Sequence, residues 1–219
     1  MIVTIDGPAG SGKSTAARGL AARLGFDYLD TGAMFRAVAL AFAGKSVDCG
    51  DPAAVERAVA DIHLDLPPGR VLVNGDDVTD AIRTPEASQA ASRVAVVPAV
   101  RRFLAAEQRR VAAGRDVVCE GRDQGTVVFP DAACKFFLTA DPRARAARRH
   151  RELAAGGSAV TLDDVLAAQE ERDARDAARA LAPLRPAADA VVVDTTTTPP
   201  AAVLDRLEEV VRRCLTARA

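Results

Sequence analysis

The chain has 219 residues, of which 49% are apolar and 27% are charged, and its formal net charge is −1. This length is enough for one substantial α/β domain with insertions, and the charge gives no electrostatic reason to expect nucleic acid or membrane binding. The four cysteines lie far apart without a C-x-x-C pair, which argues against a zinc site. This spacing fits reduced thiols, and no apolar run is long enough to span a membrane. We therefore expect a cytoplasmic protein.

The first predicted element is a β-branched segment, Ile2–Ile5, that leads into a glycine-rich loop. The loop is Gly7-Pro8-Ala9-Gly10-Ser11-Gly12-Lys13-Ser14, and a helical segment begins at Thr15. It fits the G-x-x-x-x-G-K-[ST] pattern, in which glycines let backbone N–H groups point at phosphate oxygens. Lys13 is expected to reach the β- and γ-phosphates, and the Ser14 hydroxyl can ligate Mg²⁺. Residues 7–15 are therefore predicted to bind a nucleoside triphosphate.

Further strand-like segments alternate with Ala- and Arg-rich segments of helical composition. They are Phe26–Leu29, Val117–Cys119, Lys135–Leu138 and Val191–Val193, and a last helix is expected over Ala201–Leu215. This alternation is typical of a parallel sheet covered by helices. We therefore predict an α/β fold with a parallel core sheet covered by helices.

Two segments interrupt this alternation. Short strand-like pieces at Leu64–Leu66, Val71–Val73 and Val78 are joined by Pro-Gly and Asn-Gly turns, which indicates a small antiparallel insert. Farther along, residues 154–159 read Ala-Ala-Gly-Gly-Ser-Ala, which is the composition of a hinge or lid between helices.

The segment after the second strand carries a polar cluster that begins a helix. It contains Asp30, Thr31 and Arg36, which are expected at the carboxyl edge of the sheet. Ligands bind at this edge in open α/β folds. The alternative interpretation is that Thr31 is an N-cap and the arginine is exposed.

Two more clusters lie later in the chain. In Glu120–Thr126, two glycines around Arg122 and Asp123 predict tight turns that direct this pair into a cleft; a buried ion pair that only stabilises the loop is the alternative. Helical spacing predicts that one face of a helix carries Arg172, Arg175, Asp176 and Arg179. The alternative interpretation is that this face is solvated and salt-bridged. Five more arginines flank the glycine-rich hinge, at positions 143, 145, 148, 149 and 151.

The order of these motifs resembles that of bacterial cytidylate kinases. The resemblance covers nearly the whole chain and is carried by the phosphate loop, Asp-Thr-Gly-Ala-x-x-Arg at 30–36, Ile82-Arg83-Thr84, Gly121-Arg122-Asp123-x-Gly125-Thr126-Val127-Val128-Phe129-Pro130-Asp131-Ala132, and Glu171-Arg172-Asp173-x-x-Asp176. Two residues depart from the family pattern, namely Phe35, where tyrosine is common, and Gln124, where an apolar residue is common. Neither departure removes a charged group.

The resemblance implies a monomeric enzyme that transfers the γ-phosphate of ATP to CMP or dCMP, with Mg²⁺ as cofactor. It implies a single α/β domain over residues 1–219 with the three-layer P-loop kinase fold, in which a parallel core sheet is combined with a β-rich monophosphate-binding region at about 31–110 and a short lid at about 150–160. It also implies the following roles: Lys13, Arg122 and Arg179 in catalysis; Arg148 toward ATP; Arg36, Arg122 and Arg179 on the CMP phosphate; Arg172 and Asp176 on the ribose; Ser92, Arg101 and Asp123 on cytosine. Asp30 and Thr31 belong to the same substrate site.

Two other functions share part of this pattern. A shikimate- or gluconate-type kinase would have the phosphate loop and an arginine clamp, but it gives no reason for the β insert or for the Arg122-Asp123 pair. A nucleotide-dependent switch would need a guanine-reading Asn-Lys-x-Asp segment. The chain has no such segment, since its lysines are Lys13, Lys45 and Lys135.

Overall fold

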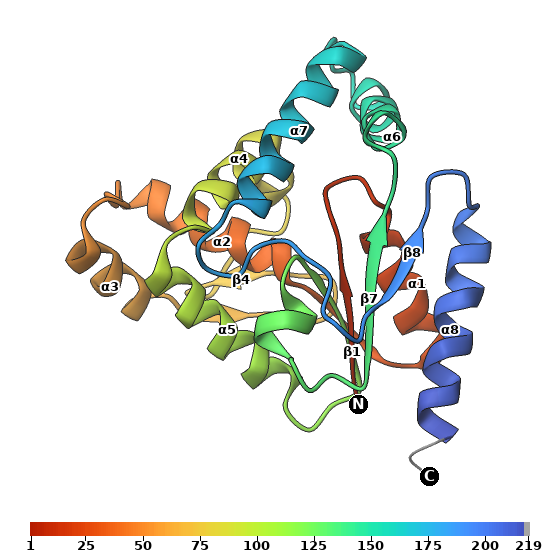
Figure 1. Ribbon diagram of the computed structural model, residues 1–219. Coiled ribbons are helices and arrows are strands. Elements are labelled where there is room, and N and C mark those ends of the chain that lie inside the picture. Colours follow the sequence, from red (N-terminus) through yellow and green to blue (C-terminus); the bar gives the residue numbers. More distant parts are fainter. Residues whose placement is uncertain (217–219) are drawn as a thin grey trace. The chain divides into compact units, whose positions relative to one another are not determined.

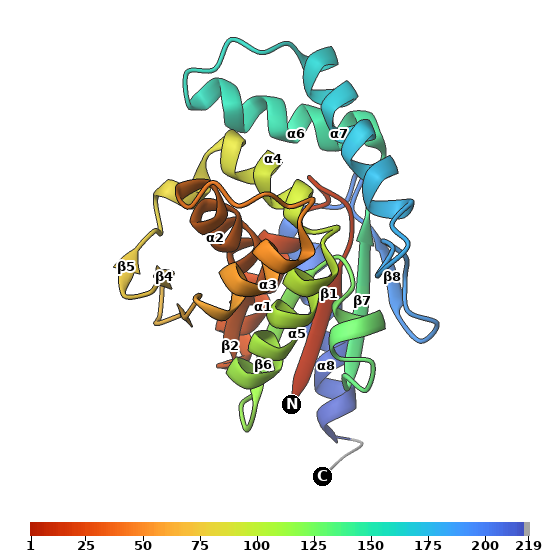
Figure 2. The ribbon, with the colours of Figure 1, turned by 90° about the vertical axis from the view of Figure 1, so that its left-hand side faces the viewer.

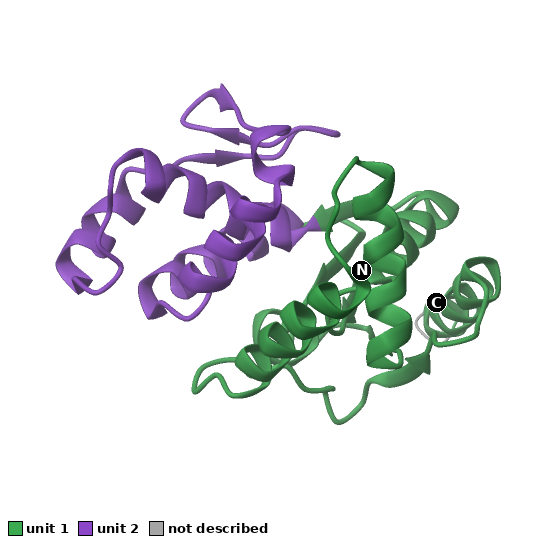
Figure 3. Cartoon of the chain, turned by 90° about the horizontal axis from the view of Figure 1, so that it is seen from above, with its two compact units in different colours: residues 1–29, 114–219 green, residues 30–113 purple. Residues whose placement is uncertain are grey.

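The computed structural model describes residues 1–216, which divide into two compact units (Figure 3). The first unit comprises residues 1–29 and the chain from Gly114 onward, and the second comprises residues 30–113. The phosphate loop and the Arg122 and Asp176 segments therefore belong to the first unit, whereas Arg36 and Arg101 belong to the second.

A five-stranded sheet in the order β2-β6-β1-β7-β8 forms the centre of the first unit (Figure 2). Its strands are β1 (Ile2–Asp6), β2 (Asp27–Asp30), β6 (Val117–Gly121), β7 (Cys134–Thr139) and β8 (Val191–Asp194). Strand β1 runs parallel to β6 and β7, and β7 runs parallel to β8. Asp6 is in register with Gly121, so the phosphate loop and the Arg122 segment both begin at the carboxyl edge of the sheet.

Helices α1 (Lys13–Leu24) and α8 (Pro200–Thr216) pack on this sheet, as the alternation of apolar segments predicts. The same unit also contains α6 (Pro142–Ala155), α7 (Leu162–Ala177) and a short π-helix η2 (Gln124–Val128) after β6. Helices α1 and α8 lie side by side (Figure 1), and their apolar side chains form one core with β1 and β7. Within this core Val3, Ile5 and Leu20 are fully buried, as is typical of central parallel strands and their covering helices.

Helices α6 and α7 pack against each other and are joined by a short loop (Figure 2). Ala154 and Ala155 belong to the last turn of α6, so the non-helical part of the predicted hinge begins at Gly156. Thr161 and Asp164 form a reciprocal capping box that begins α7. The composition of the hinge therefore corresponds to the turn of a helical hairpin.

The second unit is mainly helical. It contains α2 (Thr31–Gly44), α3 (Pro52–Ala60), α4 (Pro85–Val94), α5 (Pro98–Ala112), the 3₁₀-helix η1 (Ala81–Arg83) and a three-stranded sheet of β3 (Leu64–Asp65), β4 (Leu72–Val73) and β5 (Asp76–Asp77). Proline occupies the first turn of α3, α4 and α5, where its missing N–H has no helical partner to lose.

The predicted antiparallel insert is confirmed, but its third strand was misplaced. Strand β5 lies at Asp76–Asp77 and not at Val78. Asn74 and Gly75 have φ values of 53° and 91°, so two residues suffice for the hairpin turn and Asp76 pairs directly with Val73.

Within residues 1–216, no helix combines the length and the apolar character needed to cross a membrane. Cys119 and Cys134 are buried small side chains of the sheet, whereas Cys49 is exposed.

Candidate active site

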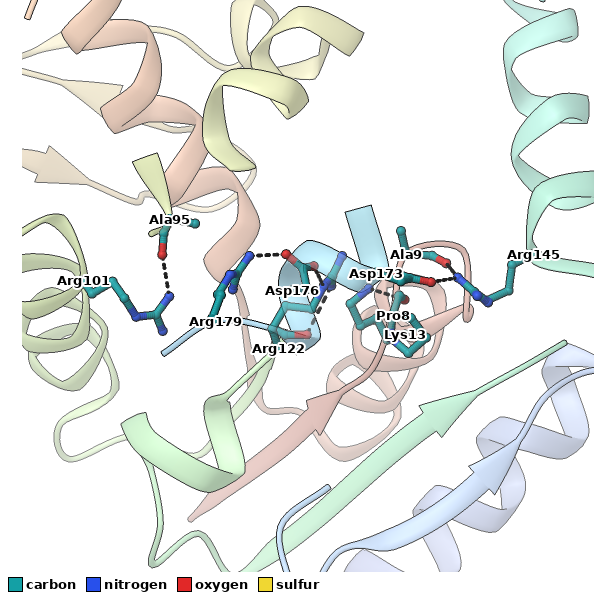
Figure 4. A network of polar contacts seen from close by, with 11 residues as sticks. Pro8, Ala9, Lys13, Ala95, Arg101, Arg122, Arg145, Asp173, Asp176 and Arg179 are labelled. Atoms are coloured by element: carbon teal, nitrogen blue, oxygen red, sulfur yellow. Dashed lines mark hydrogen bonds and ion pairs between the residues drawn. The ribbon is translucent and has the colours of Figure 1, made fainter. Parts of the chain in front are cut away.

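The phosphate-binding loop connects β1 to α1, as predicted. Gly7, Gly10 and Gly12 have φ values of 150°, 74° and 84°, which L-residues with a side chain rarely adopt. A Cβ atom at Gly7 would also lie 2.1 Å from the carbonyl oxygen of Leu138. The buried Lys13 donates from Nζ to the carbonyl oxygen of Pro8 at 3.1 Å (Figure 4). The ammonium group is therefore held across the loop, where it can reach a bound phosphate.

Ser14, the predicted Mg²⁺ ligand, donates its hydroxyl to Oε2 of Glu120 at 2.7 Å. Glu120 is buried near the carboxyl end of β6, and its Oε1 accepts a hydrogen bond from Tyr28. A hydroxyl and a carboxylate are the hard oxygen ligands that Mg²⁺ prefers. In the part of the chain that the structure describes, no three His, Cys, Asp or Glu side chains gather in a metal-binding group.

Sequence reasoning did not select Glu120 as a site residue. The available signal was its place at the end of a buried strand, directly before Arg122. Because β6 neighbours β1, that position brings its carboxylate to the start of α1.

Asp176 binds two of the predicted phosphate-binding arginines. Nε of Arg122 donates to its Oδ2 at 3.0 Å, and Nη2 of Arg179 donates to its Oδ1 (Figure 4). The Asp176 side chain is only 1% exposed, and those of Arg122 and Arg179 are 16% and 6% exposed. The solvated-face alternative is therefore wrong for Asp176 and Arg179. Charge-assisted bonds to one buried carboxylate instead orient both guanidinium groups.

The prediction that Arg172, Arg175, Asp176 and Arg179 share one helical face is wrong in two respects. Helix α7 ends at Ala177, so Arg179 reaches Asp176 from the loop that follows. In that loop the N–H of Leu184 donates to the Asp176 carbonyl, which turns the chain back. Arg175 points away from the buried Asp176, because consecutive helical residues lie about 100° apart around the helix axis. It is exposed and pairs with Glu171. Arg172 is partly buried on α7.

The chain bends at Arg122 and Asp123 and then forms a π-helix, but neither flanking glycine supplies this bend through a positive φ. Gly121 ends β6, and Gly125 is not among the described glycines that have a positive φ. Gly125 is needed for space, since a Cβ there would lie 2.9 Å from Oγ1 of Thr4. Asp123, at the N-terminus of this π-helix, is buried.

Asp6 fixes this π-helix to the end of β1. Its carboxylate accepts hydrogen bonds from the N–H groups of Gln124 and Gly125 at 2.9 and 2.8 Å. Burial raises the pKa of Asp6 from 3.8 to about 6, even though both hydrogen bonds lower it. Gln124 is itself almost fully buried, so this departure from the family pattern lies in the interior.

Two arginines of α6 contact the phosphate loop. Nη1 of Arg148, the residue predicted to approach ATP, donates to the carbonyl oxygen of Gly10 at 3.4 Å and to Oγ1 of Thr195 at 3.1 Å. Nη1 of Arg145 donates to the Ala9 carbonyl at 2.9 Å and to Oδ2 of Asp173 at 2.6 Å (Figure 4). Sequence reasoning noted Arg145 in the arginine group but did not select it, although its i, i+3 spacing to Arg148 was visible.

The second unit holds the other predicted substrate residues. Asp30 is the N-cap of α2, since its Oδ1 accepts from the N–H of Ala33 at 2.8 Å, and Nη2 of Arg36 donates to its Oδ2 at 3.2 Å. The alternative with Thr31 as N-cap and an exposed Arg36 is therefore wrong, because Arg36 is 20% exposed and paired. Thr31 lies in the first turn of α2 and is buried.

Arg101 lies on α5 and donates from Nη1 to the carbonyl oxygen of Ala95 at 3.0 Å (Figure 4). Its guanidinium carbon is 5.7 Å from the ring centroid of Phe35. Phenylalanine therefore keeps the aromatic face that a tyrosine would offer this cation. Ser92 is buried on α4, also in this unit.

Solved structures share the fold of this chain at low sequence identity. An uncharacterized protein from Eubacterium ventriosum aligns with a TM-score of 0.54 at 12% identity and covers 97% of this chain and 98% of that one. A shikimate kinase from Bacteroides thetaiotaomicron aligns with a TM-score of 0.50 at 11% identity, with the same coverage. The predicted P-loop kinase fold with a parallel core sheet is thereby confirmed.

Sequence comparison gives the family. A sequence model described as cytidylate kinase matches residues 3–213. The cytidylate kinase of Solibacter usitatus is 48% identical over 218 residues, which cover 99% of this chain and 94% of that protein. The cytidylate kinase of Mycobacterium leprae is 47% identical over 214 residues, which cover 97% and 96%. The resemblance predicted from the motifs is confirmed, and the chain belongs to the cytidylate kinase family.

Proposed function

We propose that this protein transfers the γ-phosphate of ATP to CMP or dCMP and releases ADP with CDP or dCDP. Family membership supports this reaction. The observation that carries the proposed mechanism is the Arg122–Asp176–Arg179 cluster, which lies in the same compact unit as the phosphate loop and Lys13. Phosphoryl transfer depends mainly on alignment and on neutralising charge that spreads over the transferred oxygens, and these residues supply fixed positive charge.

On the donor side, the backbone of residues 7–15 would bind the phosphates of ATP, with Lys13 on the β- and γ-phosphates. Ser14 and Glu120 are suited to hold Mg²⁺ directly or through water, and the bound cation would neutralise charge on those phosphates. The contact of Arg148 with the Gly10 carbonyl supports its assignment to the ATP site.

On the acceptor side, Arg36, Arg122 and Arg179 would bind the phosphate of CMP, while Arg172 and Asp176 would bind its ribose. Each oxygen of Asp176 accepts one bond from an arginine, and a carboxylate oxygen has a second lone pair that can accept from a ribose hydroxyl. The attacking group is a phosphate oxygen of CMP. It is already a nucleophile, so no strong general base is required.

We assign the monophosphate-binding region to about residues 31–110 and the lid to the α6–α7 connection at about 150–160. Ser92, Arg101 and Asp123 would read the base. An ionised Asp123 can accept from the N4 amine of cytosine, whereas O4 of uracil is another acceptor and would be repelled. In this proposal the enzyme acts as a monomer on small nucleotides.

A coupled assay with MgATP tests the reaction against its alternatives. CMP and dCMP are expected to be phosphorylated much faster than UMP, shikimate or gluconate. Faster turnover of shikimate or gluconate would contradict the proposal and favour a small-molecule kinase.

Base selection is tested with Asp123→Ala. We expect kcat/KM for CMP to fall about tenfold to a hundredfold, the factor for one good hydrogen-bonded contact, while the weak activity on UMP stays level or rises. The CMP:UMP ratio of kcat/KM is the measurement, with folding checked by circular dichroism. If both substrates lose the same factor, Asp123 organises the structure and does not read the base.

A further inference from the structure

Tyr28 is the single tyrosine of this chain, which contains no tryptophan. It lies on β2, and its hydroxyl donates to Oε1 of Glu120 on β6. The other oxygen of that carboxylate, Oε2, accepts the hydroxyl of Ser14 on α1 at 2.7 Å. The guanidinium of Arg18 lies 5.4 Å from the Tyr28 ring centroid. A hydrogen-bonded chain thus runs from β2 through a buried carboxylate to the first turn of α1.

This chain determines which way the Ser14 hydroxyl points. A serine hydroxyl has one proton and two lone pairs, and here the proton is directed at Glu120. Its lone pairs are then left for a cation, which is the orientation that a metal ligand needs. Glu120 can impose this orientation only while its carboxylate plane is fixed. Its contact with Tyr28 on Oε1 opposes rotation of that plane.

We propose that Tyr28 is a positioning residue for the cation that accompanies the nucleotide. It acts through Glu120 and Ser14, and the proposal rests on the assignment of Ser14 and Glu120 to Mg²⁺ under the proposed function. Removing the phenol oxygen should therefore raise the Mg²⁺ concentration that the enzyme requires. It should have a smaller effect on turnover at saturating Mg²⁺.

The test variant is Tyr28→Phe, which keeps the ring beneath Arg18 and deletes only the hydroxyl. At fixed ATP, we expect the Mg²⁺ concentration for half-maximal rate to rise about fivefold, the factor for one ordinary hydrogen bond. We expect kcat at saturating Mg²⁺ to stay within about twofold. Thr216→Val, which removes an exposed hydroxyl bonded to the Arg212 carbonyl on α8, is the matched control and should change neither quantity.

Calorimetric titration with ADP supplies a readout that does not depend on turnover. In wild type, Mg²⁺ should tighten ADP binding. In Tyr28→Phe this gain should shrink about fivefold, while ADP binding in EDTA stays unchanged. An equal loss with and without Mg²⁺ would show a merely structural role and would overturn the proposal.

Tyrosine emission reports on Tyr28 alone. A phenol that donates to a carboxylate is quenched, so Glu120→Gln should raise the emission of the folded protein, and MgADP should change wild-type emission more than ADP in EDTA does. Unchanged emission in both comparisons would overturn the proposal, even where Tyr28→Phe fails to fold. If wild type did not phosphorylate CMP, the proposed function would fail, whereas these binding and emission measurements would still decide the role of Tyr28.

Discussion

Asp6 gives this protein a pH dependence of stability that is opposite to the usual behaviour of a carboxylate. Its pKa of about 6 in the folded protein lies above the ordinary value of 3.8, because burial penalises the charged form. The folded state therefore binds this proton more tightly than the unfolded state. The group accordingly makes the protein more stable as the pH falls from 7 toward 4, and that gain is lost as the pH rises through 6.

The size of the effect follows from the two pKa values. At pH 7 the carboxyl group is mostly ionised in both states, so proton binding by this group adds almost nothing to the free energy of unfolding. At pH 5 it is about 90% protonated in the folded state and about 6% protonated in the unfolded state, which stabilises the fold by about 1.3 kcal/mol relative to pH 7.

Asp6→Asn isolates this contribution. The amide does not titrate, and its NH₂ group cannot accept from one of the two N–H groups of Gln124 and Gly125, so the variant should lose about 1–2 kcal/mol at neutral pH. Urea unfolding followed by circular dichroism at pH 5, 6 and 7 gives the free energy of unfolding of both proteins. Because all other groups are common to both, the difference between them should grow by about 1.3 kcal/mol from pH 7 to pH 5. A difference that stays constant across this range would refute the reasoning.

Two further substitutions test the phosphate-binding residues. Lys13→Ala should remain folded and lose about 10²–10³ in kcat, because the ammonium stabilises charge that develops in the transition state; turnover within about threefold of wild type would contradict its role. Arg179→Ala should lower kcat/KM for CMP strongly with little change in KM for ATP, and it should destabilise the fold by about 2 kcal/mol because Asp176 loses a buried partner. Its matched control is Arg175→Ala, which removes an exposed pair with Glu171 and should change stability by no more than about 0.5 kcal/mol and leave the kinetics unaltered.

Local patterns in the sequence predicted the elements whose physics is local. The phosphate loop was predictable because its glycines and Lys13 follow a β-branched strand, and the sheet because buried parallel strands are continuous apolar segments. The helical spacing of Arg172, Arg175, Asp176 and Arg179 was a weaker guide, since it assumes that the helix continues. The turn of the chain after Ala177 removes Arg179 from that helix and still leaves it bonded to Asp176.

Contacts between distant segments were not predictable in the same way. Glu120 bonds to Ser14 across 106 positions of sequence, and Arg145 bonds to Ala9 across 136, so neither partner is visible in a local pattern. Gly125 illustrates the same limit, because the atom that requires a glycine there belongs to Thr4, on β1. In each case the neighbour is determined by the order of strands in the sheet.

The position of Asp176 links the stability of the fold to the substrate site that we propose. Under the proposed function, Arg122 and Arg179 both bind one phosphate, so their guanidinium groups repel each other before that phosphate arrives, and burial increases the cost of this repulsion. The carboxylate of Asp176 offsets that cost in the free enzyme and holds Arg122 and Arg179 in fixed directions. Because Asp176 comes from α7 and Arg122 from the segment after β6, the pairing also joins the end of the α6–α7 hairpin to the sheet. Any change that loosens this hairpin should therefore also disturb the two cations that we assign to the CMP phosphate.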